Sequence, residues 1–126
     1  ISDAVFLGGV INQIDLPKYY HASDLYISAS FSDGSSVSLL EALACGLPVL
    51  VSDIPGNKEW IIDQENGWLF QTGDIESLTK KILDVNRKKN DLTSIKKLAR
   101  ITAEEKANWK LNFEKLLNAY HMVLIS

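Results

Sequence analysis

The sequence is poor in the residues that build disulfide frameworks and metal centres. Its 126 residues include one cysteine, Cys45, and two histidines, His21 and His121, which stand far apart. A single cysteine excludes an internal disulfide and a cysteine metal cluster, and no metal-ligand spacing links the histidines. We therefore expect no metal site. The low cysteine count also fits the cytoplasmic location that we expect.

Long apolar runs are missing as well. Serine, glycine or a charged residue interrupts every apolar stretch well before the ~18 residues of a membrane-spanning helix, and no signal segment opens the chain. Because Ile1 is not an initiator methionine, we expect a piece of a longer protein. With 46% hydrophobic and 23% charged residues, positions 1–126 suit one globular domain with a real core.

Basic residues are scarce in the first part of the chain. Up to residue 79 only Lys18 and Lys58 oppose eleven acidic residues, whereas eleven basic residues oppose five acidic ones from residue 80 onward. Solvated lysine-rich helix faces explain the basic tail most simply. Peripheral contact of the full-length protein with an anionic membrane, or with an acidic partner, is the alternative. We expect no nucleic-acid partner, because no aromatic platform accompanies the charge.

What the chain does contain is an alternation of short apolar runs and helical patterns. Strands are predicted at residues 5–9, 25–29, 48–52 and 67–70, with helices between them at residues 16–22, 36–45 and 57–62. This alternation indicates an α/β domain with a parallel, Rossmann-like sheet. The strands are apolar throughout, which predicts helices on both faces of the sheet. Four strands make a thin sheet, so we expect one or two more upstream.

After residue 74 the pattern becomes entirely helical. Helices are predicted at residues 75–88, 93–107 and 109–124. Asp74 suits the N-cap of the first, and Thr93 or Ser94 that of the second. The last helix carries an apolar side made of Phe113, Leu116, Leu117, Tyr120 and Leu124. The asparagine and aspartate near residue 90 indicate a turn rather than a domain boundary.

Residues 32–48 say the most about function. A loop rich in glycine and serine follows a predicted strand and opens a nearly apolar helix; Asp33 lies in the loop and Glu41 eight positions later. Unpaired amides and the positive end of the dipole at a helix start suit an anion. A carboxylate further along the helix can accept two hydroxyl hydrogen bonds at once. Diphosphate at the helix start and a ribose diol on Glu41 form a coherent nucleotide-sugar site.

Each of these features also has a purely structural interpretation. Glu41 can be a buried carboxylate that backbone amides or a lysine satisfy, since unpaired burial is costly. Serine and aspartate are ordinary helix caps, and the glycine spacing fits neither a Walker loop nor a dinucleotide fingerprint. A helix dipole contributes only about 0.3–1 kcal/mol, thin support for a diphosphate with few cations nearby. Tyr19 and Tyr20 could stack on a base, but we expect them to pack under the first strand.

The same stretch resembles the signature of the retaining glycosyltransferases of the group 1 class (family 4). The resemblance rests on ASDLYISAS at 22–30, DGSSVSLLEALACGLPVL at 33–50, SDIPGNKEW at 52–60 and NGWLF at 66–70. It covers about residues 5–85, and the tail agrees only in being helical. It implies the GT-B fold, in which two Rossmann-like domains face each other across the active site. This chain would be the C-terminal donor-binding domain, without its first strands and the N-terminal acceptor domain.

The resemblance also implies a site. In that family two glutamates eight positions apart bracket it: the second matches Glu41 and binds the ribose hydroxyls, and the first matches Asp33, near the donor sugar. Asp33 is one methylene shorter than the usual glutamate, which puts its reach and the sugar preference in question. The base would lie near Val10 and Ile11. The amides that receive the diphosphate would be those of Gly34, Ser35, Ser36 and Val37.

We therefore expect the parent enzyme to transfer a sugar, with retention, from a nucleoside diphosphate sugar to a saccharide or lipid-linked acceptor, without a further cofactor. The family's arginine and lysine that hold the diphosphate lie upstream of this chain, so the chain alone should be inactive. One alternative is a nucleotide-sugar epimerase of the same architecture. Another is a non-catalytic α/β module that binds a partner through its basic tail. A receiver-like domain would need an acidic cluster that we do not find.

Overall fold

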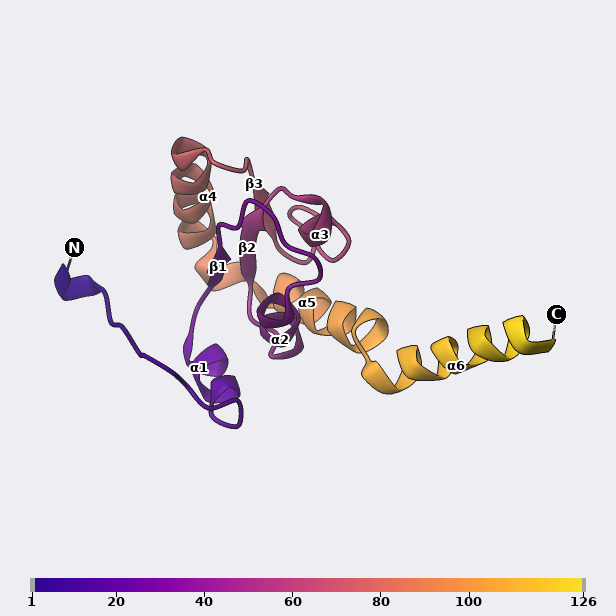
Figure 1. The fold of residues 1–126 in the computed structure, drawn as a ribbon. Helices are drawn as coiled ribbons and strands as arrows, with labels where there is room; N and C mark the ends of the chain where they lie inside the picture. Colours follow the sequence, from indigo (N-terminus) through magenta and orange to yellow (C-terminus); the bar gives the residue numbers. More distant parts are fainter. Residues whose placement is uncertain (1, 126) are drawn as a thin grey trace.

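Residues 2–125 are described by the structure, a computed structural model, and they form a parallel three-stranded sheet with helices on both faces (Figure 1). The strands are β1 (Tyr26–Ser28), β2 (Val49–Ser52) and β3 (Trp68–Phe70), in the order β1-β2-β3. Ile27 pairs with Leu50, and Val51 pairs with Leu69. The predictions of strands at residues 25–29, 48–52 and 67–70 are confirmed, with each strand slightly shorter than its apolar run.

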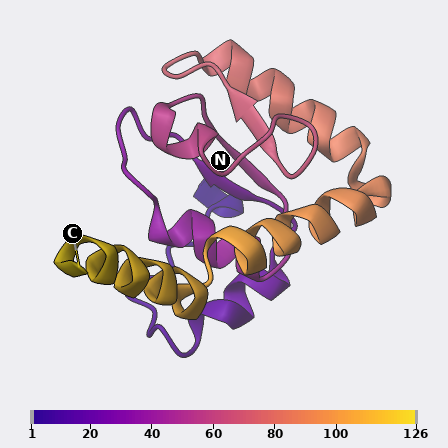
Figure 2. The ribbon, with the colours of Figure 1, turned by 90° about the vertical axis from the view of Figure 1, so that its right-hand side faces the viewer.

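The central strand, β2, divides the core into two layers. Val49 and Val51 face α2 (Val37–Ala44) and α5 (Thr93–Lys106), while Leu50, between them, faces α4 (Ile75–Arg87) and β3. All four residues of β2 are buried. The central strand is thus covered on both sides, as its continuous apolar run predicted, whereas Ile27 in the edge strand β1 is 44% exposed. Figure 2 shows α5 running along the face that α2 also covers.

The predicted strand at residues 5–9 is wrong. A 3-10 helix, η1 (Ser2–Ala4), opens the chain, and the residues after it extend away from the body without joining the sheet (Figure 1). Phe6 and Leu7 are each 87% exposed. A strand needs a neighbour to satisfy its backbone groups, and no described strand lies beside this segment. Apolar composition alone does not supply that neighbour.

Two short helices also differ from the expectations. The helix expected at 57–62 is α3 (Pro55–Lys58), because Pro55 takes the first helical position, where its fixed φ suits a helix start. A short 3-10 helix, η2 (Lys89–Asp91), stands where a turn was expected.

The predicted caps Thr93 and Ser94 lie within α5, whose N-cap position Leu92 makes no side-chain cap bond. Asp74 does cap α4, accepting from the Ser77 amide at 3.0 Å.

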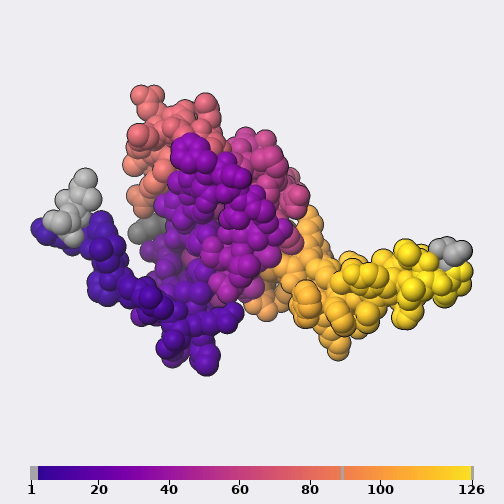
Figure 3. All heavy atoms as spheres, viewed as in Figure 1, coloured from indigo at the N-terminus to yellow at the C-terminus, as the bar shows by residue number. Residues whose placement is uncertain are grey.

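The last helix, α6 (Trp109–Ile125), projects from the body on the side opposite the N-terminal segment (Figure 3). Its bounds agree with the prediction, but its apolar side is not buried against the rest of the described chain. Leu116 is 45% exposed and Leu117 42%, while the rings of Trp109 and Phe113 stack with centroids 5.7 Å apart. Across residues 2–125, no helix combines the length and apolarity needed to cross a bilayer.

Candidate functional site

The loop of residues 29–36, called the β1–α2 loop below, leaves the carboxyl end of β1 and opens α2. This is the edge of a parallel sheet at which ligands bind in open α/β folds. Asp33, Gly34 and Ser35 are exposed on the loop, and Ser36 is half-buried at its end. The structure therefore places these predicted residues at a ligand-accessible edge.

Hydroxyl groups organise the start of α2. Ser36 is the N-cap, with extended backbone and a side-chain oxygen that accepts from the Leu39 amide at 3.5 Å. Its hydroxyl lies 3.2 Å from that of Ser38, which lies 2.7 Å from the hydroxyl of Tyr26 on β1. The first-turn amides of α2, including that of Val37, have no carbonyl partner within the helix. The structure thus shows Ser36 as an N-cap of α2, and the binding of an anion at this helix start stays a prediction.

Glu41 lies on the next turn of α2, half-buried at the wall of a cavity of about 150 Å³. Tyr20, on α1 (Leu16–Ala22), donates its hydroxyl to Glu41 Oε2 at 3.1 Å. Burial first, and then this hydrogen bond, raises the pKa of Tyr20 to about 12, so the phenol is a donor at neutral pH. The cavity is lined by Gln13, Leu16, Pro17, Tyr20, Glu41, Ala44 and Cys45.

The pair of Tyr20 and Glu41 settles two open questions about these residues. Tyr20 does not pack under a strand at residues 5–9, because no strand forms there; it packs on the α2–β2 core, edge-on to Tyr26. Glu41 is half-buried with Tyr20 as a partner, and among the described side chains no lysine forms an ion pair with it. One of its oxygens accepts from Tyr20, and a carboxylate with two oxygens keeps further acceptor sites.

A second groove, of about 300 Å³, borders Glu41 on the side of α5. Arg100 and Glu104 line it together with Glu41. Arg100 donates through Nη1 to the carbonyl oxygen of Ala44, at the end of α2, and through Nε to Glu104 at 2.6 Å. A cation from the basic half of the chain thus lies on the same groove as the candidate ribose carboxylate.

The cations of the first 79 residues are both engaged. Lys18 pairs with Asp15 at 2.7 Å, and Lys58 pairs with Asp53, directly after β2. Neither therefore brings an uncompensated positive charge to the β1–α2 loop. Among the first 79 residues, the scarcity of cations seen in the sequence therefore persists at the β1–α2 loop.

The structure does not bring all the predicted residues together. Val10 is fully exposed and Ile11 partly so, and neither lines the two cavities beside Glu41. Gln13, three positions beyond Val10, does line the smaller one. Gln13 and Arg100 were missed because neither belongs to a local pattern, and their place depends on how α1 and α5 pack on α2.

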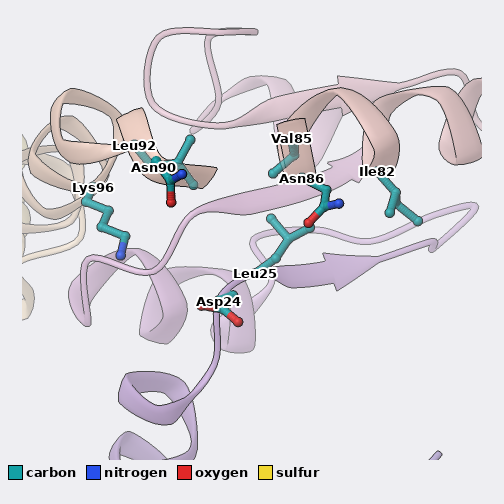
Figure 4. A pocket seen from close by; sticks show the side chains of 8 residues that line it. All are labelled: Asp24, Leu25, Ile82, Val85, Asn86, Asn90, Leu92 and Lys96. Carbon is teal, nitrogen blue, oxygen red and sulfur yellow. The ribbon is translucent and has the colours of Figure 1, made fainter. Parts of the chain in front are cut away.

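A larger cavity, of about 340 Å³, lies at the opposite edge of the sheet (Figure 4). Asp24 and Leu25, just before β1, face residues from α4, η2 and the start of α5 across it. Its polar groups are Asp24, Asn86, Asn90 and Lys96. It opens at the amino end of β1, away from the edge where the β1–α2 loop and Glu41 gather, and it contains none of the predicted site residues.

Comparison with known proteins identifies the family. The family model described as "Glycosyl transferases group 1" matches residues 1–108. The chain belongs to the group 1 glycosyltransferases. Among the relatives of this glycosyltransferase chain, the amylovoran biosynthesis glycosyltransferase AmsK of Erwinia amylovora is 29% identical over 122 residues, covering 92% of this chain and 30% of AmsK.

Solved structures agree on the fold of this group 1 chain. Sucrose-phosphate synthase from Thermosynechococcus elongatus matches with a TM-score of 0.91 over 98% of this chain and 31% of its own, at 24% identity. The pneumococcal O-GlcNAc transferase GtfA, in complex with UDP and GlcNAc, matches with a TM-score of 0.69 and 27% identity over 92% of this chain and 25% of its own. The predicted family and α/β fold class are confirmed. The chain spans about a third of the length of these proteins or less.

Proposed function

We propose that this chain is the donor-binding part of a retaining glycosyltransferase, which moves a sugar from a nucleoside diphosphate sugar to a saccharide or lipid-linked acceptor. The observation that carries this proposal is the position of Glu41. Its carboxylate lies at a cavity wall, held by Tyr20 and with acceptor capacity to spare. The same helix begins at an exposed loop of glycine and serine.

In this proposal the two ends of the donor bind to successive turns of α2. The ribose diol donates its hydroxyls to Glu41. The diphosphate accepts from the amides of residues 34–37, where the helix dipole adds favourable charge. Asp33, exposed on the β1–α2 loop, accepts from hydroxyls of the donor sugar. The base lies against residues 10–13, which include Val10, Ile11 and the cavity-lining Gln13.

Positioning and electrostatic stabilisation of the leaving diphosphate then account for the chain's share of catalysis. The helix start supplies only part of the charge, and Lys18 and Lys58 are already paired. We propose that the rest of the parent enzyme supplies the missing cations, the acceptor domain and further strands beyond β1. The 126 residues alone are then inactive in transfer.

GtfA supports the choice of a nucleoside diphosphate as ligand, since that relative was solved with UDP and GlcNAc. The relative AmsK takes part, by its name, in amylovoran biosynthesis, which supports a saccharide acceptor for this chain. Neither name identifies the base or the sugar used here. Separate titrations with UDP, GDP and ADP are therefore needed to identify the base.

The test is a calorimetric titration of the chain with each nucleotide, alongside Glu41→Gln. This variant keeps the side-chain volume and an acceptor for Tyr20, but removes the charge and one acceptor. We expect one nucleotide to bind, and the variant to lose about 1–3 kcal/mol of binding free energy, as when a buried polar partner is left unmade. Glu105→Gln, exposed on α5 and outside both cavities beside Glu41, is the matched control and should bind as the wild type does.

Two results would count against the proposal. Equal affinity of the wild type and Glu41→Gln would place the nucleotide elsewhere. If none of the three nucleotides binds either the chain or the longer enzyme that contains it, a donor site at α2 is excluded. Transfer of sugar by the 126 residues alone would contradict the proposal that the rest of the enzyme is needed for activity.

A further inference from the structure

Helix α3 lies directly against the β1–α2 loop through Gly56. Gly56 is buried, and a Cβ built on it would lie 2.6 Å from the carbonyl oxygen of Asp33 and closer still to that of Gly34. The backbone of Gly56 does not lie in the left-handed region, so its glycine is required by space and not by φ. The backbone of α3 can approach the backbone of the β1–α2 loop this closely because residue 56 has no side chain.

A buried hydrogen-bond chain anchors the same loop at its beginning. Asn57, 2% exposed, donates through Nδ2 to the carbonyl oxygen of Ser52 at 2.8 Å. The hydroxyl of Ser52, 1% exposed at the end of β2, donates to the carbonyl oxygen of Ser30 at 2.6 Å. Buried polar groups are costly unless paired, so these bonds fix the geometry of α3, β2 and the loop together.

We propose that Gly56 and Asn57 are positioning residues for the β1–α2 loop, and that they set the place of the amides at residues 34–37. This inference rests on the proposed function for the part that concerns diphosphate. Hydrogen bonds from amides to an anion weaken steeply with distance and angle. A loop displaced by a side chain at residue 56 therefore binds the anion poorly, although residue 56 itself never touches it.

The chain offers a matched control for the steric part. Gly67, at the entrance to β3, is also crowded, though less tightly than Gly56, because a Cβ there would lie 2.6 Å from Val49 Cγ2 and 3.1 Å from the Val49 carbonyl oxygen. Those atoms belong to β2 and not to the β1–α2 loop. Gly67→Ala therefore strains the core, whereas Gly56→Ala strains the loop.

The experiment compares ¹⁵N-labelled wild-type chain, Gly56→Ala and Gly67→Ala at a temperature at which all three are folded. Amide signals of residues 33–37 should shift in Gly56→Ala and stay in place in Gly67→Ala. The dissociation constant for UDP should rise about tenfold or more in Gly56→Ala, the order of loss expected from a misplaced binding group. In Gly67→Ala it should stay within about twofold, even though the variant is less stable.

Ser52→Ala guards against a Gly56→Ala variant that does not fold. It removes the hydroxyl that donates to Ser30 and accepts from Asn57 at 3.5 Å, while the bond from Asn57 to the Ser52 carbonyl oxygen is kept. The chain should therefore remain folded while the signals of residues 30–34 shift. The inference is overturned if the signals of residues 30–34 are unchanged in Ser52→Ala and the signals of residues 33–37 are unchanged in Gly56→Ala. It is also overturned if Gly67→Ala weakens UDP binding as much as Gly56→Ala. A wild-type chain that binds no UDP would count against the proposed function, and the amide signals would still decide the role of Gly56.

Discussion

The hydroxyl of Tyr20 donates to Glu41 Oε2 at 3.1 Å, joining α1 to α2 across 21 positions of the sequence. The bond occupies one oxygen of a carboxylate that otherwise faces a cavity. It therefore orients Glu41 without exhausting its capacity to accept hydrogen bonds. If Glu41 binds a ribose diol, Tyr20 is the residue that holds the carboxylate ready for it.

Tyr20→Phe should weaken nucleotide binding while leaving the fold intact. The loss of one hydrogen bond predicts about 0.5–1.5 kcal/mol, or roughly two- to tenfold in the dissociation constant. Tyr120→Phe is the control, because Tyr120 is 60% exposed on the projecting helix α6 and lines neither cavity beside Glu41. Calorimetry of the two variants with the nucleotide that binds the wild type makes the comparison. Equal losses in both variants would assign the effect to general packing.

Alkaline unfolding provides a second test of the Tyr20–Glu41 bond. Burial, then the hydrogen bond to Glu41, raises the pKa of Tyr20 from 10.0 to about 12. A raised pKa favours the protonated folded form, so this stabilisation is complete below pH 10 and is lost as the pH rises toward 12. The unfolding free energy of the wild type should thus fall more steeply than that of Tyr20→Phe in this range. Urea titrations at several pH values measure the difference, and parallel curves would contradict it.

The sheet and α2 were largely predictable, because local signals determine them. The runs that became β1, β2 and β3 are apolar and bounded by turn residues, which indicates strands without long-range information. Their burial is not uniform, because β2 is buried throughout whereas Ile27 in β1 is 44% exposed. Ser36 and Gly46 mark the two ends of α2: Ser36 caps it, and Gly46 has a φ of +65°, which favours glycine. Asp33 and Glu41 follow from the same local stretch.

The contacts that complete the site depend on tertiary packing and were not predictable. Arg100 reaches the Ala44 carbonyl from 56 positions away. Gly56 gives no sign in the sequence of which backbone it must approach. The prediction of a strand at residues 5–9 was wrong because a strand-like composition does not form a strand without a neighbouring strand. Local pattern thus located the helix and its carboxylates, and packing determined what surrounds them.

Asp63→Asn should lower the stability of the turn that leads into β3. Asp63 accepts from the Leu69 amide at 2.8 Å and pairs with Lys81 of α4 at 3.0 Å. Burial acts to raise the pKa of Asp63, but these donors outweigh it and hold the pKa below its usual value of 3.8. The variant should lose about 1–3 kcal/mol of unfolding free energy at neutral pH.

The pH dependence of this loss has a definite sign. A lowered pKa stabilises the folded state above the unfolded pKa, near 4, and the gain disappears as the pH falls through the folded value. The difference between the wild type and Asp63→Asn should therefore shrink in acid. Asp53→Asn, which breaks only the exposed pair with Lys58, should cost about 0–1 kcal/mol. A constant difference from neutral to acid pH would count against the lowered pKa.

Substitution of one leucine in the core and one on α6 should affect stability very differently. Leu43 is fully buried between α2 and the sheet, so Leu43→Ala should cost about 2–5 kcal/mol. Leu116 on α6 is 45% exposed, and Leu116→Ala should change the unfolding free energy by less than about 0.5 kcal/mol. Chemical denaturation at two protein concentrations measures both. A large, concentration-dependent loss in Leu116→Ala would show that α6 is covered by another copy in solution.

Asp33→Glu tests whether the length of the loop carboxylate sets the donor sugar. The side chain of Asp33 is exposed, and it is the backbone carbonyl of this residue that lies against Gly56, so the longer side chain should leave stability unchanged. The added methylene moves the carboxylate about 1.5 Å outward. We expect UDP itself to bind with the same affinity, because in the proposed function its diphosphate accepts from backbone amides and not from Asp33. The affinity for UDP-sugars should change by about two- to tenfold, the range for one hydrogen bond gained or lost. Titrations with UDP, UDP-glucose and UDP-N-acetylglucosamine separate the two effects, and a variant that changes affinity for UDP alone would remove Asp33 from the sugar site.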